Sequence, residues 1–228
     1  MEVRTCGIEG CAEIDGPAIV IDVLRAFTVA AWAFERGATD ITLAPTVADA
    51  LAWKEELGAV AVNDGAPDGL FDLMNSPDHV SAANLEGRRV ILRTEAGTRG
   101  AIAARHAPIL FCTGFTTAAA TVRELKALGA DDVTMVATGG DDDMACADYM
   151  AALLTNGWAE PRPFLKRAAE SDISRMLQTY IQLNQPGVGK RDVALALEAD
   201  RFDFAMRGAD QAGRLVLRRV EPSPAGRG

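Results

Sequence analysis

The chain alternates short apolar runs with longer amphipathic stretches. The first clear apolar run is AIVIDV at 18–23, which follows the turn-forming Asp15-Gly16-Pro17 and is rich in β-branched residues. A run with almost no polar alternation is typical of a strand that helices cover on both faces, as in a parallel sheet. An amphipathic stretch follows at 28–36 and ends at Gly37, a residue type that commonly closes helices. The opening therefore predicts a strand followed by a helix.

The same alternation recurs as far as residue 155. Further strands are predicted at 41–43, 60–62, 89–92, 109–112 and 133–137. Further helices are predicted at 47–57, at 97–106, from 116 or 117 to 129, and from the acidic run 141–143 to 155. A polar, glycine-rich loop is predicted at 63–77. We therefore expect an α/β fold, a three-layer α/β/α sandwich with a largely parallel sheet.

The pattern changes after residue 157. The remaining residues predict an amphipathic helix at 164–183 and a break rich in glycine and proline at 184–189. They also predict a second short helix at 192–199 and two alternating strands at 202–206 and 214–220. We expect the two strands to form a closing antiparallel pair.

Three parts of the chain are therefore expected. Residues 1–157 are predicted to form an α/β core that carries the active-site loops, and 158–220 to form C-terminal helices and a β pair packed on that core. Residues 221–228 are predicted to be a disordered tail. The helical segment 164–199 is a candidate interface for a homo-oligomer.

Composition and charge narrow the class of partner. The chain is 49% hydrophobic and 24% charged, which is an ordinary globular balance. Its net charge of −9 argues against nucleic acid and against a membrane surface, because both favour a basic protein. A small phosphorylated metabolite needs only a local positive site and stays compatible. The sequence has neither an apolar run of about 18 residues nor a secretory pattern at its start, so we expect a cytoplasmic protein.

Several familiar kinds of site are missing from the sequence. The four cysteines contain no CxxC pair, which disfavours a zinc site and a disulfide framework. The glycine-rich nucleotide-binding fingerprints and the GxSxG elbow are absent. The two histidines, His79 and His106, have no acidic or cysteine partner at metal spacing. A zinc enzyme and a histidine-based phosphatase are therefore disfavoured.

Polar residues follow the ends of the predicted strands, where ligands bind in open α/β sheets. They are Asp22, Arg25, Asn63, Asp64, Asp72, Thr94, Glu95, Thr98 and Asp141–Asp143. Oxygen ligands suit Mg²⁺, which usually shares its shell with water and a substrate phosphate. The predicted metal ligands are Asp22, Asp64, Asp72 and Asp142.

Structural alternatives exist for each of these residues. Asp22 is either a functional carboxylate or the cap of the following helix, and Arg25 either binds substrate or forms an ion pair with Asp22. One residue of 141–143 is expected to cap the helix that begins there. Glu95 is a metal ligand, a general base or a first-turn helix residue, and it is kept as a catalytic candidate with Asp22 and Arg25.

Three segments resemble motifs of one known family. VIDVLRAFT at 20–28 resembles that family's VIDVLRAST, FDLMNSP at 71–77 resembles FDLGNSP, and ILRTEAGTRG at 91–100 is similar to LTTTNGTRA. Their order and spacing agree, and weaker similarity runs to about residue 154. The chain thus resembles the 2-phosphosulfolactate phosphatases, a family of magnesium-dependent phosphatases.

The resemblance implies hydrolysis of a phosphate monoester on a small sulfonated hydroxy acid, with Mg²⁺, in coenzyme M synthesis. The family's motif residues carry over to Asp22, Arg25, Asp72, Asn75, Ser76, Gly97 and Thr98. Of these, the substrate-binding candidates are Asn75, Ser76, Gly97 and Thr98. A turn and helix start is the alternative for Asn75 and Ser76.

Two loops depart from the family pattern. VNDGAPDG at 62–69 replaces a GERGG-like loop, and Glu95-Ala96 replaces the Thr-Asn of TTNGT. These changes remove an arginine and add carboxylates, so the substrate stays open. The alternatives are a phosphatase of an unrelated small metabolite, and a catalytically altered relative that acts as a ligand-binding or assembly protein.

Overall fold

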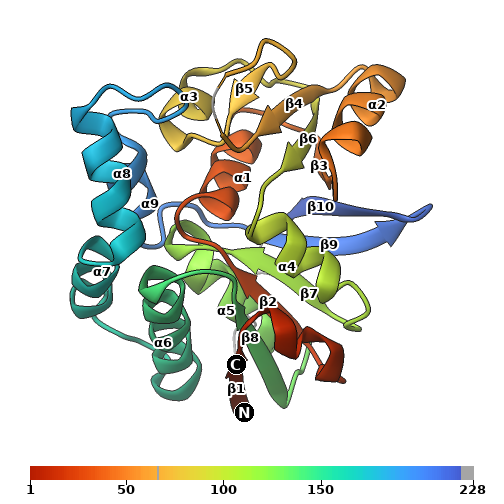
Figure 1. Ribbon diagram of the computed structural model, residues 1–228. Helices are drawn as coiled ribbons and strands as arrows, with labels where there is room; N and C mark the ends of the chain where they lie inside the picture. Colours follow the sequence, from red (N-terminus) through yellow and green to blue (C-terminus); the bar gives the residue numbers. More distant parts are fainter. Residues whose placement is uncertain (66, 222–228) are drawn as a thin grey trace.

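The computed structural model describes residues 1–65 and 67–221. Within these residues helices pack around one ten-stranded sheet (Figure 1). The strands are β1 (Glu2–Cys6), β2 (Ala18–Ile21), β3 (Asp40–Leu43), β4 (Val60–Asn63), β5 (Leu73–Met74), β6 (Arg89–Arg93), β7 (Leu110–Thr113), β8 (Asp132–Ala137), β9 (Ala205–Gln211) and β10 (Arg214–Val220). The helices are η1 (Ile8–Glu13), α1 (Ala26–Glu35), α2 (Val47–Leu57), α3 (Pro77–Ala82), α4 (Gly97–Ala103), η2 (Phe115–Thr117), α5 (Ala118–Ala127), α6 (Asp141–Asn156), α7 (Arg162–Ala169), α8 (Asp172–Gln182) and α9 (Asp192–Ala196).

The sheet consists of two parallel groups joined by an antiparallel hairpin. Its order is β1-β8-β2-β7-β9-β10-β3-β6-β4-β5. The strands on either side of the hairpin are parallel within their own group, whereas β9 is antiparallel to β7 and β10 is antiparallel to β3. The predicted α/β sandwich, its largely parallel sheet and its closing antiparallel pair are confirmed. The pair lies in the middle of the sheet.

Burial on both faces of β2 explains its uninterrupted apolar sequence. Ala18 and Val20 belong to one hydrophobic core, and Ile19 and Ile21 belong to the core on the opposite face. All four side chains are fully buried. The period of two along a strand thus supplies both layers of the sandwich from one apolar run.

Some elements differ from the sequence predictions. The helix predicted at 164–183 is two helices. Helix α7 ends at Ala169 with Glu170 as its C-cap, and Ser171 caps α8 by accepting a hydrogen bond from the Ser174 N–H at 3.1 Å. The strand predicted at 202–206 begins at Ala205 as β9. Strand β1 and the short β5 were not predicted, since neither carries a clear apolar run. Most of the predicted tail, residues 222–228, lies outside the described residues.

The carboxyl ends of the two parallel groups converge. Antiparallel pairing through the hairpin would direct the groups to opposite ends of a flat sheet. Sheets twist by roughly 20–25° between neighbouring strands, and this twist accumulates along the path from β2 to β6. Helices α1 and α4, which follow β2 and β6, therefore contact each other near the middle of the molecule (Figure 1). The candidate site lies at this junction. Among the described residues, the helices are too short or too polar to cross a membrane.

Candidate functional site

Asp22 occupies the junction between β2 and α1. Its side chain is buried, and Oδ1 accepts a hydrogen bond from the Ala26 N–H at 2.9 Å. Across the junction stands Gly97, at the start of α4. A Cβ atom on Gly97 would lie 2.6 Å from Oδ2 of Asp22 and 2.7 Å from Cβ of Ala26. Position 97 therefore requires glycine, because any larger residue would push α4 away from the carboxylate.

The pKa values of Asp22 and Asp142 are raised. Burial raises the pKa of Asp22 to about 7, with further repulsion from Asp142 and Asp64, while the N–H groups of Ala26 and Gly97 oppose the shift. Burial likewise raises the pKa of Asp142 to about 6. Oδ1 of Asp142 is buried and has no hydrogen-bond partner among the described residues. The site thus holds buried carboxylates whose negative charge is not balanced by positive groups nearby.

The other two residues of the acidic run have structural contacts. Asp143 accepts hydrogen bonds from the Val23 N–H at 2.8 Å and the Gly139 N–H at 2.8 Å, and so ties α6 to the end of β2. Burial, followed by repulsion from Asp22 and Asp142, raises its pKa well above the usual range. Asp141 is exposed and pairs with Arg167 of α7. Of the three, Asp142 alone combines burial with a free oxygen.

Arg25 is buried and held by the C-terminal segment. Its Nη1 donates to Oδ2 of Asp192 at 2.7 Å and to the Gly187 carbonyl oxygen at 3.0 Å. Its Nη2 lies 3.7 Å from Oδ1 of Asp64. The expected alternative, an ion pair with Asp22, is thus replaced by one with Asp192. The guanidinium group is fixed through one side and keeps donors on the other.

Asp192, in the first turn of α9, was missed by the sequence reasoning. It is 0% exposed, and its two oxygens also accept hydrogen bonds from Ser76 Oγ at 2.6 Å, the Asp78 N–H at 3.0 Å and the Gly189 N–H at 2.9 Å. Its sequence signal was weak, because aspartate is common in a first helical turn. An aspartate between a glycine-rich break and the apolar VALAL run was the available indication.

Ser76 and Asn75 support the site in different ways. Ser76 donates to Asp192 and caps α3 by accepting from the His79 N–H at 3.3 Å, so its hydroxyl is fully used. Asn75 donates from Nδ2 to Oδ1 of Asp64 at 3.4 Å. The side-chain oxygens of Asn75 and Asn63 are buried and have no partner in the described part of the chain. These acceptors are available to a donor or a cation.

Two predicted site residues, Asp72 and Glu95, lie in other surroundings. Asp72 pairs with Lys54 at 2.9 Å and accepts from the Ala61 N–H at 2.8 Å, so it fastens a loop to β4. Glu95 is 73% exposed on its side chain and pairs with Arg93 at 2.5 Å.

Thr98 is buried at the start of α4. Its hydroxyl accepts a hydrogen bond from the Thr94 N–H at 3.1 Å, and the Thr94 hydroxyl accepts one from the Thr98 N–H at 3.0 Å. This reciprocal pair stabilises the turn between β6 and α4. Thr98 therefore shapes the turn that carries Gly97.

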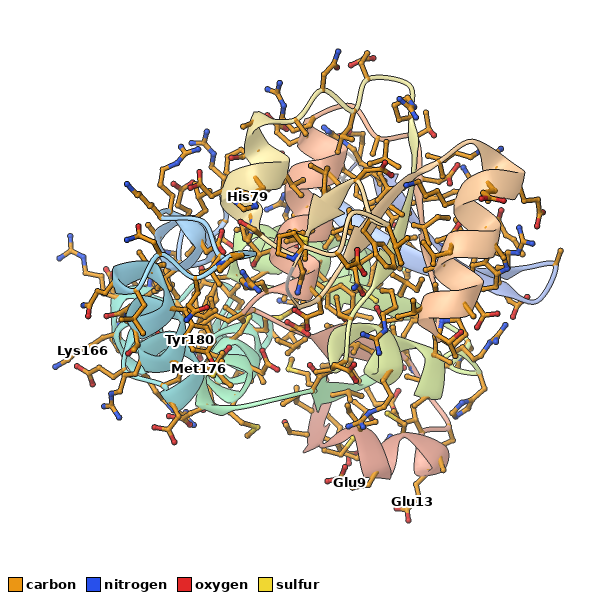
Figure 2. The ribbon with its side chains drawn as sticks, turned by 45° about the horizontal axis from the view of Figure 1, so that its top comes forward. Glu9, Glu13, His79, Lys166, Met176 and Tyr180 are labelled. Carbon is orange, nitrogen blue, oxygen red and sulfur yellow. The ribbon has the colours of Figure 1, made fainter. Side chains whose placement is uncertain are left out.

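A cavity of about 400 Å³ opens beside Arg25 and Asp64. Arg25, Asp64 and Gly65 line one part of it, and residues of α8 and of the loop at 185–188 line the rest and are called its walls here. Figure 2 labels Met176 and Tyr180, which lie close together on α8. The cavity gives a small ligand access to the arginine.

No ready-made metal cluster is present in residues 1–65 and 67–221, where no group of three or more His, Cys, Asp or Glu side chains is arranged to hold an ion. Magnesium commonly takes one or two protein carboxylates and completes its shell with water and phosphate. The free oxygen of Asp142 and the crowded, buried carboxylate of Asp22 fit that smaller requirement.

The fold and the site define an α/β protein with a carboxylate- and arginine-containing candidate ligand site at strand ends. Comparison with known families gives the more particular identity: residues 6–207 match the family described as 2-phosphosulpholactate phosphatase. The chain belongs to this family, as the three motifs predicted.

Similar proteins carry the same family name. A Bacillus subtilis protein is 33% identical over 83% of this chain and 85% of its own length. A Synechococcus protein (strain CC9605) is 28% identical over 90% of this chain and 89% of its own length, and a Deinococcus radiodurans protein is 37% identical over 59% and 58%. Each is named a probable 2-phosphosulfolactate phosphatase. These names give no support to the alternative of a catalytically altered binding or assembly protein.

Proposed function

We propose that this protein is a phosphatase that hydrolyses a small phosphate monoester at the junction of β2, β6 and α6. One observation carries the proposal: two buried carboxylates with raised pKa values, Asp22 and Asp142, interact at strand ends, and Asp64, which also acts on Asp22, lies 3.7 Å from an arginine that is fixed by Asp192. Raised carboxylate pKa values and a preorganised arginine are typical of sites that handle phosphate oxygens and protons. Membership of a phosphatase family supports the same reaction.

Mg²⁺ is part of the proposal, with Asp22 and Asp142 as its protein ligands. Both side chains are buried, and the unpartnered Oδ1 of Asp142 supplies an oxygen that a cation would satisfy. When bound, the ion would neutralise phosphate oxygens and polarise the attacking water. Asp64 is the remaining acidic candidate near the site, whereas the contacts of Asp72 with Lys54 and Ala61 argue against a ligand role for it.

Arg25 is proposed to bind the phosphate group. Its Nη1 is engaged by Asp192 and Gly187, so the guanidinium plane is held in one orientation. Its Nη2 lies on the side of Asp64, at the cavity. Donors held in this way stabilise charge that develops on phosphate oxygens without reorganising during the reaction. Nε of Arg93, at the end of β6, is also buried and has no hydrogen-bond partner among the described residues. This N–H is therefore a further available donor.

The test is phosphate release from a panel of small phosphate monoesters, including 2-phosphosulfolactate and an aryl phosphate, with added Mg²⁺ or with EDTA. We expect release with Mg²⁺ and a fall of at least about 100-fold in EDTA, the scale of effect typical of a lost electrostatic group. Release that is equal in both conditions would refute the metal part alone. No release from any ester would refute the phosphatase proposal.

A further inference from the structure

The walls of the cavity beside Arg25 are largely apolar, with Gln185 as a neutral polar member. Helix α8 contributes Met176, Leu177 and Tyr180, and the neighbouring loop contributes Pro186 and Val188. Positions 176 and 180 are one helical turn apart, so they share a face of α8 (Figure 2). Met176 is 40% exposed and Tyr180 is 39% exposed. Large apolar side chains left in water around a concave site are typical of ligand pockets.

The loop wall is held in place by close backbone contacts. A Cβ on Gly187 would lie 2.5 Å from the carbonyl oxygen of Gly65, so the two loops touch at glycines. The Gly187 carbonyl accepts from Arg25, and the Gly189 N–H donates to Asp192. The apolar wall is therefore built on the same contacts that fix the arginine.

The charges around the cavity do not suit a second strong anion. Among the described residues that line it, Arg25 is the one cation and Asp64 the one anion. Arg25 is already paired with the fully buried Asp192. Arg93 does not line the cavity, and its Nη2 pairs with Glu95. A phosphate at Arg25 would use the available positive charge. A sulfonate placed against Met176 and Tyr180 would lose hydration and meet only neutral donors, the Tyr180 hydroxyl and the Gln185 amide, with no second cation to offset that loss.

We infer that the substrate is a phosphate monoester whose carbon group is uncharged and apolar. The phosphate lies at Arg25 and the carboxylates, and the carbon group lies against α8 and residues 186–188. This inference rests on the proposed function for the reaction. It differs from the preference for a sulfonated hydroxy acid that the family resemblance implies.

The test compares matched esters and uses the protein with Mg²⁺. Butyl phosphate and sulfopropyl phosphate have chains of equal length that end in a methyl group or a sulfonate. We expect kcat/KM to be at least about tenfold higher for butyl phosphate. From ethyl to pentyl phosphate, kcat/KM should rise by about threefold to fourfold for each added methylene, the gain for burying one CH₂ group.

A charge placed in the wall tests the position of the carbon group. Met176→Lys should lower the butyl-to-sulfopropyl ratio of kcat/KM by on the order of tenfold, as expected for one partly hydrated charge pair. The matched control is Leu183→Lys, because Leu183 is 62% exposed at the end of α8 and does not line the cavity. The control should leave the ratio unchanged.

Failures of the two proposals are distinguishable. A higher kcat/KM for sulfopropyl phosphate, or a ratio that Met176→Lys does not change, overturns the inference and leaves the phosphatase intact. If neither ester releases phosphate, calorimetric binding of butylphosphonate and sulfopropylphosphonate decides. Tighter binding of butylphosphonate would support the apolar cavity although the phosphatase proposal has failed. Tighter or equal binding of sulfopropylphosphonate would overturn the apolar-substrate inference as well.

Discussion

At the scale of single residues, Asp192 connects the C-terminal segment to the proposed phosphate site. One carboxylate holds Arg25, Ser76 and two backbone N–H groups. Arg25 and Ser76 are both motif residues, but they come from distant parts of the chain and meet only through this side chain. In the proposed site Asp192 is thus a positioning residue, which would act on substrate through the orientation of Arg25.

Asp192→Asn should lower both stability and phosphate binding. The substitution leaves the Arg25 charge buried without its partner, a loss of about 3–5 kcal/mol in the free energy of unfolding. KM should rise more than kcat falls, because a misplaced Arg25 binds the phosphate less well. Urea unfolding and steady-state phosphate release measure the two effects. Asp203→Asn is the control, since Asp203 is an exposed partner of Arg123, and it should change stability by less than about 0.5 kcal/mol.

The pKa values of Asp22 and Asp142 predict a pH dependence of stability in EDTA. Both pKa values, about 7 and about 6, are above the ordinary value of 3.8. The folded state therefore holds protons that the unfolded state has released, and the free energy of unfolding should fall as pH rises from about 4 to about 7. Asp22→Asn should flatten this decline in urea titrations at several pH values. A stability that rises through this window would contradict the assignment.

At the scale of elements, the turn before α4 and the loop before α9 shape the site. Both approach their neighbours through glycine: Gly97 meets Asp22, and Gly187 meets Gly65. The expectation that ligands bind beyond strand ends selected Asp22, Arg25 and Asp142, because buried apolar strands are readable from sequence. Their functional roles stay a prediction. It also selected Asp72 and Glu95, whose local partners Lys54 and Arg93 depend on side-chain directions that a linear pattern does not contain.

Gly97→Ala should reduce activity through geometry. Its Cβ would overlap Oδ2 of Asp22, so α4 or the carboxylate must shift. We expect a loss of about 1–3 kcal/mol in stability, as for other overpacked sites, and at least a tenfold fall in kcat/KM. Gly58→Ala is the comparison: Gly58 has φ of +59° at the end of α2 with no atom within 4 Å of the added Cβ. That change should cost about 1 kcal/mol and leave kcat/KM unaffected.

At the scale of the whole molecule, the central hairpin joins the two parallel groups. Strands β9 and β10 lie between β7 and β3, and their buried Met206, Leu215 and Leu217 belong to the same core as Phe34 of α1. The alternating pattern of the hairpin was readable from sequence, but its central position was not. Position depends on pairing between residues far apart in the sequence, such as Leu110 with Gly208 and Leu43 with Leu215, which local periodicity does not encode. The division of the chain at residue 157 stays a prediction.

A fragment of residues 1–157 should not fold cooperatively. Removing the hairpin would separate β7 from β3 and expose the core that the hairpin covers. Far-UV circular dichroism and urea titration of the fragment measure this directly. A cooperative transition with a midpoint near that of the full chain would show that the α/β core is independent of the C-terminal segment.

The central claim is that the Asp22 site performs the hydrolysis, and a matched pair of variants tests it most directly. Asp22→Asn removes the buried carboxyl charge, and Asp148→Asn makes the same change in an exposed partner of Arg167. With Mg²⁺ and the best ester of the panel, we predict that kcat/KM falls by at least about 100-fold in Asp22→Asn and stays within twofold in Asp148→Asn, with both proteins folded. Equal activity in the two variants would contradict the account.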